Sequence, residues 1–559
     1  MQKYHRHFNT TATPQHEPMP GAKTKQVKMR SGGYGWKVGD WDRLERFLIL
    51  GTEGGTYYVR EHKLTIDAAN AVTRCIDKDG PRVVQIIVDV SQGGRAPKND
   101  PALFALAMCA KMGDERTKAA AYQALPKVAR IGTHLFHFME YAKAFGGKGG
   151  NGFKRALARW YTDKPSEKLS YQVVKYQQRD GWSHRDILRL AHPSTESPIH
   201  QDIFRWVVKG ELPEWRAATE PGDMGTILGF EAAKTAENVK EVVGLIEQYD
   251  LPREAIPTQW LNKVEVWKAL LPKMPVFAMI RNLGKMTSLG MVTNTSEETR
   301  HIVKTITDEA RLIKGRVHPL AVLTALKTYR AGKGFRGSLT WSPAARVVDA
   351  LDDAFYKSFK AVQPTDKRLC LALDVSGSMS SAMPGVPFVS CYEGAAAMAM
   401  VTARVESTYE IMGFTAGGPG FISMGSDRRT MFGTWGRSGN GLVPLSISPR
   451  QRLDDIVQYM RGLPMGGTDA SLPIRWARDN KIAFDAFVTY TDNESWAGPE
   501  HVAQAMKSYR DTMGIDAKLI AVAFSADKYS VCDPDDALMM DVVGFDTATP
   551  NVISDFIAH

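Results

Sequence analysis

An aspartate and two serines follow directly on an apolar stretch of the chain. The segment LCLALDVSGSMSS spans residues 369–381 and places Asp374, Ser376 and Ser378 two residues apart. One carboxylate and two hydroxyls are oxygen donors of the kind that a hard cation such as Mg²⁺ prefers. Because the serines are neutral, the ion keeps positive charge and can accept an oxygen from a partner. The spacing therefore predicts a divalent-metal site, most plausibly for Mg²⁺, on a loop that leaves a buried strand.

Two further oxygen donors stand where they could complete this site. Thr468 lies in the Gly-rich turn PMGGTDAS before a predicted helix, and Asp492 follows the predicted strand AFVTYT. The carboxyl ends of parallel strands meet at one edge of a sheet, and ligands bind beyond that edge. We therefore expect five residues to surround one ion: Asp374, Ser376, Ser378, Thr468 and Asp492.

The elements that must position these residues alternate between strand and helix from residue 367 onward. The apolar stretches LCLALDV, YEIMGFT, AFVTYT and KLIAVAF are separated by helical patterns such as EGAAAMAMVTARV and PEHVAQAMKSYRDTM. This alternation predicts a doubly wound α/β domain with a mainly parallel sheet. We expect the Gly-rich insertion at 416–448 to be a surface loop or irregular hairpin, and DPDDALMMD at 533–541 to be a capped turn after the last core strand.

The preceding part of the chain has a different pattern. Segments such as WDRLERFLIL, PALFALAMCAKM and GTHLFHFMEYAKAF place apolar residues three and four apart, which is typical of amphipathic helices. Many such helices with tight connections predict an all-α array of helical repeats, an α-solenoid. The predicted organisation is a polar leader at 1–40, the helical-repeat domain at 41–366 and the α/β domain at 367–559.

Composition narrows the class of protein further. No run of about 18 apolar residues occurs and the N-terminus lacks the apolar core of a signal peptide, so we expect a cytoplasmic protein outside membranes. The five cysteines never form C-x-x-C and are expected to be core thiols. The net charge of +10 is uneven: residues 367–559 carry 16 Lys+Arg and 22 Asp+Glu, which leaves 55 and 39 for residues 1–366. The basic part is expected to meet a polyanion, most plausibly nucleic acid.

The basic residues cluster at 148–192, which hold ten Lys or Arg and four Asp or Glu. Several of these cations stand four apart, where they share one helix face: Arg155 with Arg159, Lys175 with Arg179, and Arg185 with Arg189. Neighbouring like charges repel, and phosphates along RNA would relieve that repulsion and release counterions. Ordinary solvated helix faces are the alternative interpretation of this pattern.

The segment GWSHRDILRLAH shows how one of these helices begins. Ser183 can cap a helix that starts at His184, with Asp186 at the capping-box position. In that register Arg185 and Arg189 project from one face, and His184 stands at the positive helix end, where a phosphate is favourably received. The predicted RNA-binding residues are Lys175, Arg179, His184, Arg185 and Arg189.

Several blocks together resemble one known family. They are RCIDKDGPRVVQIIVDVSQGGRAPKNDPALFALAMCAK, KYQQRDGWSHRDILRLAHP, FAMIRNLGKM, RVHPLAVLTALKTYRAGKGFRGSLTWSP, GGTDASLPIRWA, TDNESWAG and DPDDALMMDVVGFDT. From about residue 40 to the end, the chain resembles the Ro autoantigen or TROVE-domain family. The D-x-S-x-S loop with Thr468 and Asp492 is similar to the metal-ion-dependent adhesion site of von Willebrand factor A domains. The leader and the insertion at 416–448 depart from the family pattern.

The resemblance implies a ring of HEAT-like helical repeats closed by a von Willebrand factor A domain. It further implies a ribonucleoprotein without catalytic activity. Such proteins bind small noncoding Y-type RNA on the outside of the ring and admit single-stranded 3′ ends of misfolded RNA to its central hole. In bacterial relatives the Y RNA can link the ring to an exoribonuclease. We expect a monomer.

Two other functions remain as alternatives. A protein-binding scaffold would use the metal site to capture a partner's carboxylate. A metal-dependent phosphoesterase would use the Asp374 site, but hydroxyl donors supply no evident general base.

Overall fold

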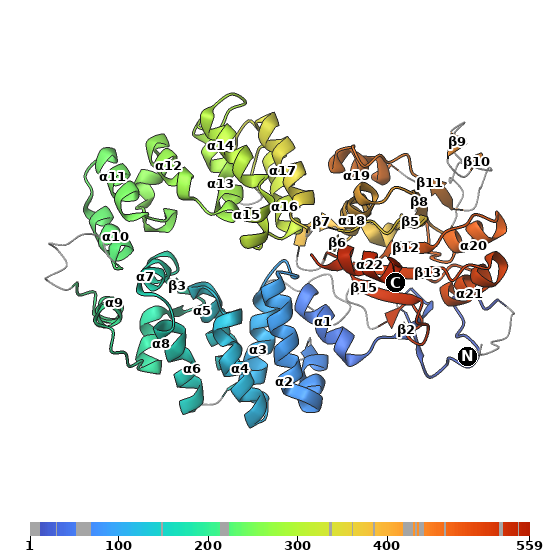
Figure 1. Cartoon of the computed structure of the whole chain (residues 1–559), viewed down its shortest axis with the longest axis horizontal. Coiled ribbons are helices and arrows are strands. Elements are labelled where there is room, and N and C mark those ends of the chain that lie inside the picture. The colour runs from blue at the N-terminus through green and yellow to red at the C-terminus, as the bar shows by residue number, and fades with distance from the viewer. Residues whose placement is uncertain are drawn as a thin grey trace. The chain divides into compact units, whose positions relative to one another are not determined.

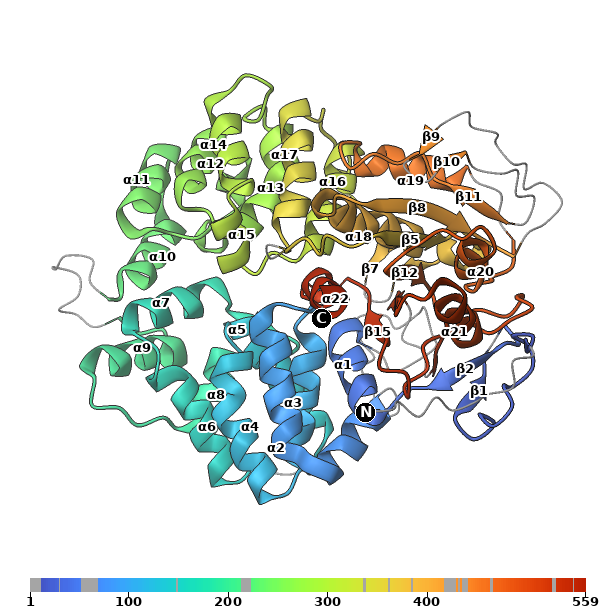
Figure 2. The same ribbon diagram turned by 45° about the vertical axis from the view of Figure 1, so that its right-hand side comes forward.

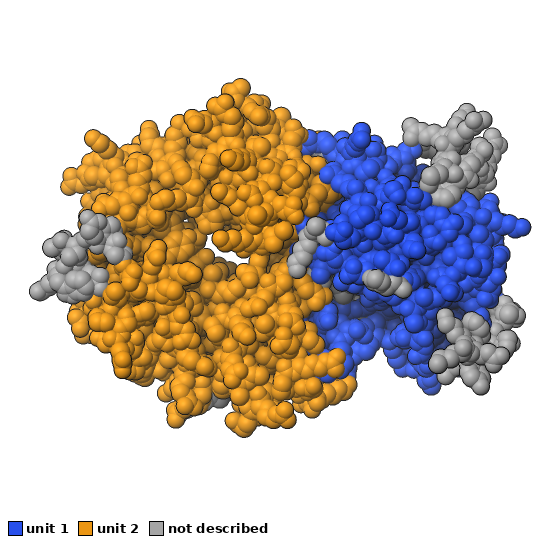
Figure 3. All heavy atoms as spheres, in the orientation of Figure 1, with its two compact units in different colours: residues 1–71, 359–559 blue, residues 72–358 orange. Residues whose placement is uncertain are grey.

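The computed structural model divides the chain into two compact units (Figure 3). Unit 1 comprises residues 1–71 and 359–559, and unit 2 comprises residues 72–358. The structure describes residues 12–29, 31–51, 69–146, 149–212, 223–334, 338–359, 362–383, 386–416, 429–430, 433–434, 441–462, 466–524, 529–545 and 547–558. The units differ from the predicted three-part division, because the leader and the first predicted helix group with the C-terminal part of the chain.

Unit 2 is built from helices (Figure 1), as the sequence pattern predicts. The helix at the start of unit 2, α2, bends at Asp79, whose backbone is not helical, just before Pro81. Proline cannot donate the backbone hydrogen bond of a helix interior, which explains the bend. The α-helices of this part are α2 (Asn70–Gly93), α3 (Asp100–Met112), α4 (Glu115–Val128), α5 (Gly132–Ala144), α6 (Asn151–Thr162), α7 (Ser166–Lys175), α8 (His184–Ala191), α9 (Pro198–Lys209), α10 (Gly225–Thr235), α11 (Val239–Tyr249), α12 (Val264–Leu270), α13 (Val276–Ser288), α14 (Glu297–Ile306), α15 (Glu309–Lys314), α16 (Pro319–Arg330) and α17 (Ala345–Lys357).

The two ends of this helical array meet. The Nε of Arg316, in the turn between α15 and α16, donates a 3.0 Å hydrogen bond to the carbonyl of Gln92 near the end of α2. His318 Nε2 lies 3.3 Å from the carbonyl oxygen of Arg95. Residues more than 200 positions apart in the chain are therefore neighbours, and unit 2 returns to its own beginning.

Unit 1 is organised around a six-stranded sheet with the order β11-β8-β5-β12-β13-β15. Its strands are parallel to their neighbours except β11, which pairs antiparallel with β8 at the edge. The strands are β5 (Leu369–Asp374), β8 (Tyr409–Phe414), β11 (Leu442–Pro444), β12 (Ala486–Thr491), β13 (Lys518–Ala523) and β15 (Met539–Val543). The doubly wound α/β prediction is confirmed.

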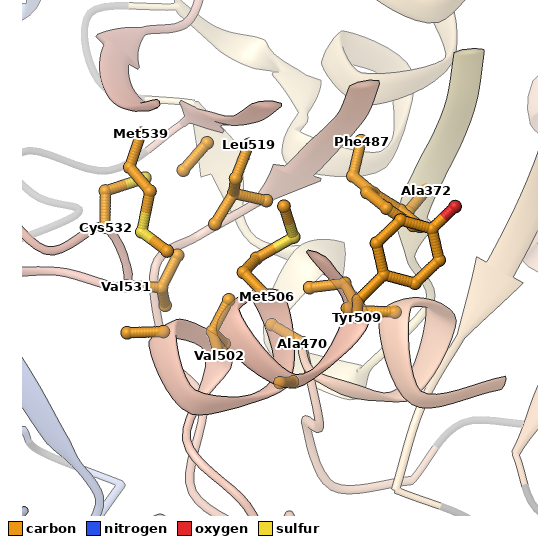
Figure 4. Close-up of a cluster of buried hydrophobic side chains, with 14 of the residues drawn as sticks. Ala372, Ala470, Phe487, Val502, Met506, Tyr509, Leu519, Val531, Cys532 and Met539 are labelled. Carbon is orange, nitrogen blue, oxygen red and sulfur yellow. The ribbon is translucent and has the colours of Figure 1, made fainter. Parts of the chain in front are cut away.

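Helices cover both faces of this sheet, so β5 and β12 are buried throughout (Figure 2). On one face α18 contacts β5 and β12, and Thr402 of α18 lies 3.2 Å from the hydroxyl of Tyr490. On the other face Met506 and Tyr509 of α21 pack with Ala372 and Phe487 (Figure 4). The helices of unit 1 are α1 (Asp40–Leu50), α18 (Cys391–Val405), α19 (Leu453–Arg461), α20 (Leu472–Asp479), α21 (Val502–Met513) and α22 (Thr549–Ala558).

Two predictions about unit 1 need correction. The segment at 533–541 is more than a capped turn after the last core strand, because Met539–Val543 forms β15, a further parallel strand beside β13. The leader also forms structure: its strands β1 (Gln26–Lys28) and β2 (Tyr34–Lys37) build a small antiparallel sheet with β14 (Tyr529–Ser530). The pairing of β2 with β14 spans most of the chain, which local pattern does not reveal.

Three short strand pairs also occur in the described structure. They are β3 (Gln178–Arg179) with β4 (Trp182–Ser183), β6 (Ala382–Met383) with β7 (Val386–Ser390), and β9 (Arg429–Thr430) with β10 (Gly433–Thr434). Much of the Gly-rich insertion at 416–448 lies outside the described residues. All five cysteines are buried, as predicted. Among the described residues, no helix combines the length and apolar character needed to cross a membrane.

Candidate metal centre and basic helix surface

The predicted metal-binding residues lie at the carboxyl edge of the central sheet. Asp374 is the last residue of β5, and Asp492 directly follows β12, the parallel neighbour of β5. The chain leaves β5 toward β8 on one side, and β12 lies on the other side, so this position is the switch point where doubly wound sheets bind ligands.

Hydrogen bonds hold the Asp374 carboxylate in place. Its Oδ1 accepts a 2.8 Å bond from the backbone N–H of Ser376, and its Oδ2 accepts a 2.7 Å bond from the hydroxyl of Thr491. The hydroxyl oxygens of Ser376 and Ser378 are 3.1 Å apart. Asp374 and Ser376 are buried and Ser378 is exposed, so the D-x-S-x-S loop reaches from the core to the surface.

Asp492 belongs to the same group of side chains. Asp492 is fully buried. Its carboxylate accepts a 3.2 Å hydrogen bond from the N–H of Glu494 and another hydrogen bond from Ser378. Burial raises the pKa of Asp492 above its ordinary value, and the charge of Asp374 raises it further. Burial likewise raises the pKa of Asp374. Two buried carboxyl groups that disfavour each other's ionisation would be stabilised by a cation between them.

Thr468 lies in a loop that contacts the loop after β12. Its carbonyl accepts hydrogen bonds from the N–H groups of Trp496 and Ala497, each 3.1 Å long. The preceding residue, Gly467, accepts a 2.7 Å bond from the hydroxyl of Thr415, which directly follows β8. Thr468 is therefore at the same sheet edge as Asp374 and Asp492, and its side chain is 2% exposed.

These residues fit a hard divalent cation. The described residues contain no cluster of three or more His, Cys, Asp or Glu suited to a metal ion, so hydroxyl oxygens must complete any coordination by the two aspartates. Oxygen donors with only two carboxylates are compatible with Mg²⁺, which usually retains water ligands. Sequence reasoning missed Thr491, whose hydroxyl fixes Asp374; its position at the end of a buried strand, one residue before Asp492, was the available signal.

The predicted RNA-binding segment forms a hairpin and a capped helix in unit 2. Strands β3 and β4 pair Arg179 with Trp182 and lead into α8. The Ser183 side chain accepts from the N–H of Asp186, and the Asp186 carboxylate accepts a 2.9 Å bond from the N–H of Ser183. The predicted capping box is therefore confirmed.

The cations of this segment differ in their surroundings. Arg185 and Arg189 are exposed and share one face of α8, while the apolar residues Ile187 and Leu188 are buried, as predicted. Arg179 is exposed and lies 3.6 Å from the carboxylate of Asp180. Lys175 is only partly exposed, because its ammonium donates to the hydroxyl of Tyr171 at 2.8 Å and lies over the Tyr171 and Tyr176 rings.

His184 differs from the prediction, because its imidazole is 2% exposed and cannot meet a phosphate at the surface. Its Nδ1 lies 2.9 Å from the Tyr161 hydroxyl, and its ring contacts the rings of Phe136 and Trp160. Burial lowers the pKa of His184 to about 3. The first residue of α8 is thus a neutral core residue that anchors the helix against α5 and α6.

Comparison with known proteins identifies two family domains in the chain. The TROVE domain family matches residues 27–330, and the Ro60 vWA domain family matches residues 368–557. The chain is 38% identical over 535 residues to RNA-binding protein RO60 of Deinococcus radiodurans, covering 95% of each chain. It is 34% identical to RNA-binding protein RO60 of Caenorhabditis elegans, covering 96% of this chain and 91% of that protein.

A solved structure agrees with these matches. The crystal structure of the Deinococcus radiodurans RO (RSR) protein superposes with a TM-score of 0.69 at 39% sequence identity, covering 93% of this chain and 99% of that one. The fold, the two matched domains and the nearly full-length relatives agree with the resemblance carried by the sequence blocks. The chain therefore belongs to the Ro60 family, which combines a TROVE domain with a von Willebrand factor A domain.

Proposed function

We propose that this protein binds RNA without catalysing its turnover and acts in the cytoplasm as the protein component of a Ro ribonucleoprotein. Small noncoding Y-type RNA is its structured partner, bound along the basic surface around α8. Single-stranded 3′ ends of misfolded RNA enter the helical unit, which makes the protein part of RNA quality control. An exoribonuclease joins through the RNA. The names of the relatives support RNA as the ligand class.

The observation that carries this proposal is the fixed, exposed pair of arginines on α8. The capping box sets where the helix begins, and the buried His184 anchors it, so Arg185 and Arg189 project from a rigid helix. Asp186 is the only acidic residue of α8, and its carboxylate accepts hydrogen bonds from Ser183. A preorganised pair of guanidinium groups suits two phosphates of a folded RNA backbone.

Unit 2 also offers a place for single strands. The array returns to its own beginning at the Arg316 and Gln92 contact, and Figure 3 shows an opening among its side chains. A strand end can pass through such an opening, whereas a folded RNA remains outside. These two features support separate sites for structured and single-stranded RNA.

The decisive experiment compares paired substitutions on two exposed helix faces. Arg185→Ala with Arg189→Ala is expected to weaken binding of a structured small RNA and to lower the salt slope by roughly 1.5 to 2, or two phosphate contacts. The control is Arg300→Ala with Lys304→Ala, which removes two exposed cations at the same spacing from α14. Equal RNA affinity and salt slope for both double variants and the wild type would refute the α8 site.

The metal site completes the proposal. Asp374, Ser376, Ser378, Thr468 and Asp492 would hold Mg²⁺, which supplies a positive centre able to accept an oxygen from a partner. Asp374→Ala is expected to abolish Mg²⁺ binding in calorimetry while RNA affinity stays unchanged, because the basic surface belongs to unit 2. Purified protein is expected to leave RNA intact in the presence of Mg²⁺, and degradation lost in the Asp374→Ala variant would overturn the non-catalytic assignment.

A protein-binding scaffold is the second candidate, and Trp496 favours it. Trp496 is 40% exposed although its backbone N–H donates to the carbonyl of Thr468 in the loop of the proposed metal site. A rigidly held, exposed tryptophan beside a metal site is typical of a protein interface. A partner that is released by EDTA and also lost in Trp496→Ala would support this role, and retention under both conditions would exclude it.

A further inference from the structure

The leader of the chain reaches the two loops that carry Thr468 and Asp492. Strand β2 joins it to the rest of unit 1 by pairing with β14, and within the leader the N–H of Tyr34 donates a 2.9 Å bond to the carbonyl of Gln15. Gln15 itself bonds through its N–H to the carbonyl of Gly498 at 3.0 Å. Main-chain hydrogen bonds at Gln15 and along β2 therefore fix the leader to the rest of unit 1.

The side-chain amide of Gln15 is buried and fully hydrogen-bonded. Its Nε2 donates to Asp469 Oδ1 at 2.9 Å and to the carbonyl of Glu500 at 3.0 Å. Its Oε1 accepts from the hydroxyl of Ser495 at 2.7 Å and from the N–H of Gly498 at 3.1 Å. A carboxamide has two N–H donors and two acceptor lone pairs, so this environment uses the complete capacity of the group. With 1% of Gln15 exposed, water does not compete for these bonds.

These four bonds connect the two loops of the metal site. Asp469 follows Thr468, while Ser495 and Gly498 lie in the segment that follows Asp492. The loops also bond to each other, since the N–H of Ala470 donates to the Ser495 hydroxyl at 3.0 Å. Ser495 thus receives a bond from one loop and donates to Gln15, which in turn donates back to Asp469. The amide of Gln15 closes this cycle of hydrogen bonds.

The leader makes a second contact beside Asp492. The N–H of Ser31 donates to Glu494 Oε2 at 3.1 Å, and the Ser31 hydroxyl donates to the same oxygen. The other carboxylate oxygen of Glu494 accepts from the hydroxyl of Tyr529 in β14. The N–H of Glu494 is the group that donates to the Asp492 carboxylate. The leader therefore holds the residue that orients a predicted metal ligand.

We propose that the leader is an intramolecular clasp, with Gln15 as the positioning residue that sets the affinity of the metal site. This inference rests on the metal site of the proposed function. Binding is strongest when the donors are held in place before the ion arrives, and residues that orient metal ligands typically contribute 10- to 100-fold in affinity. The clasp makes the metal affinity depend on Gln15, which lies 454 residues before its hydrogen-bond partner Asp469.

The test measures Mg²⁺ and Mn²⁺ binding to the full-length chain by calorimetry. Gln15→Met keeps the length of the side chain but removes its four hydrogen bonds, and a 10- to 100-fold weaker affinity is expected. Ser31→Ala is expected to weaken binding at least threefold. Lys25→Ala is the control, because it removes an exposed leader contact with Asp535 that does not touch either metal loop; its affinity should equal that of the wild type.

Hydrogen exchange of the same variants separates the clasp from general stability. In Gln15→Met the amides of Trp496 and Ala497, which bond to Thr468, are expected to exchange faster while those of β2 and β14 stay protected. If the β2 and β14 amides also lose protection, Gln15→Met has destabilised the leader as a whole, and the metal affinity of Ser31→Ala becomes the test. An unchanged affinity in Ser31→Ala overturns the clasp. Wild-type affinity in a folded Gln15→Met variant also overturns it. Absence of binding by the wild type would instead refute the metal site itself.

Discussion

The buried imidazole of His184 is expected to make the helical unit lose stability in mild acid. Its pKa is lowered to about 3, first by burial, with the charge of Lys164 acting in the same direction. A histidine in the unfolded chain has a pKa of about 6.5. Between these two values the unfolded chain binds a proton that the folded chain excludes, so the unfolded state is favoured as pH falls below about 6.5. The contribution of His184 is complete above that pH and is lost progressively toward pH 3.

The size of the effect follows from the same two values. Lowering the pH from 7.5 to 5.0 should reduce the free energy of unfolding by about 2 kcal/mol through His184 alone. His184→Asn removes this titration and keeps a polar atom near the Tyr161 hydroxyl, which lies 2.9 Å from Nδ1 in the wild type. His192→Asn is the matched control, because His192 is exposed and ends α8 in a left-handed conformation that asparagine tolerates.

Urea unfolding followed by circular dichroism at both pH values provides the assay. Between pH 7.5 and 5.0 the wild type and His192→Asn should lose about 2 kcal/mol more stability than His184→Asn. Desolvation also lowers the pKa of the half-buried His134 to about 3, but His134 is common to all three proteins and cancels in the comparison. The same pH dependence in His184→Asn and the wild type would refute the assignment of a buried neutral imidazole.

Three further substitutions test individual contacts by urea unfolding. Thr491→Val removes the 2.7 Å bond to Asp374 and should cost about 1.5 to 3 kcal/mol, whereas Thr491→Ser keeps the hydroxyl and should cost less; equal losses would contradict the role of the bond. Ser183→Ala breaks the capping box and should cost about 1 kcal/mol, with Ser183→Thr restoring most of it; no loss would show that the cap is not stabilising. Gly80→Ala should cost roughly 1 to 3 kcal/mol, because its Cβ would lie 1.9 Å from the Thr117 hydroxyl, and Thr117→Ser should not relieve that contact; an unchanged stability would mean that α2 and α4 can separate.

The positions of the proposed metal ligands could be predicted because they follow from local pattern and a general rule. Asp374 ends an apolar run that is long enough for one buried strand, and Asp492 follows another. Parallel strands bring their carboxyl ends to one edge, so the two carboxylates meet once β5 and β12 are neighbours. The loop contacts of Thr468 could not be predicted, since they depend on which backbone groups two irregular segments present to each other.

The beginning of α8 shows where local reasoning fails. The capping box joins Ser183 and Asp186, three residues apart, so the sequence alone predicts it correctly. The first helical position would ordinarily be open to solvent, and a phosphate contact for His184 was a reasonable expectation. Burial of that position depends on contacts with two other helices, through Phe136, Trp160 and Tyr161. The spacing of residues 183–189 does not predict how these helices pack.

The leader was predicted as a polar segment because few of its residues are apolar, yet polar contacts fix it to unit 1. Apolar side chains of the leader also pack inward, since Met19, Ala22 and Trp36 belong to the hydrophobic core of unit 1. Arg46 of α1 is also buried, at 1% exposed, and pairs with Asp541 of β15. A buried ion pair stabilises a fold only while both partners are present, because a single remaining charge lacks its compensation. Cutting the chain at residue 367 would therefore leave Asp541 without Arg46 and the edge of β14 without β2. The two family segments at 27–330 and 368–557 follow one another in sequence. The compact unit that carries the proposed metal site instead combines residues 1–71 with 359–559, so the helical unit is an insertion between its two segments.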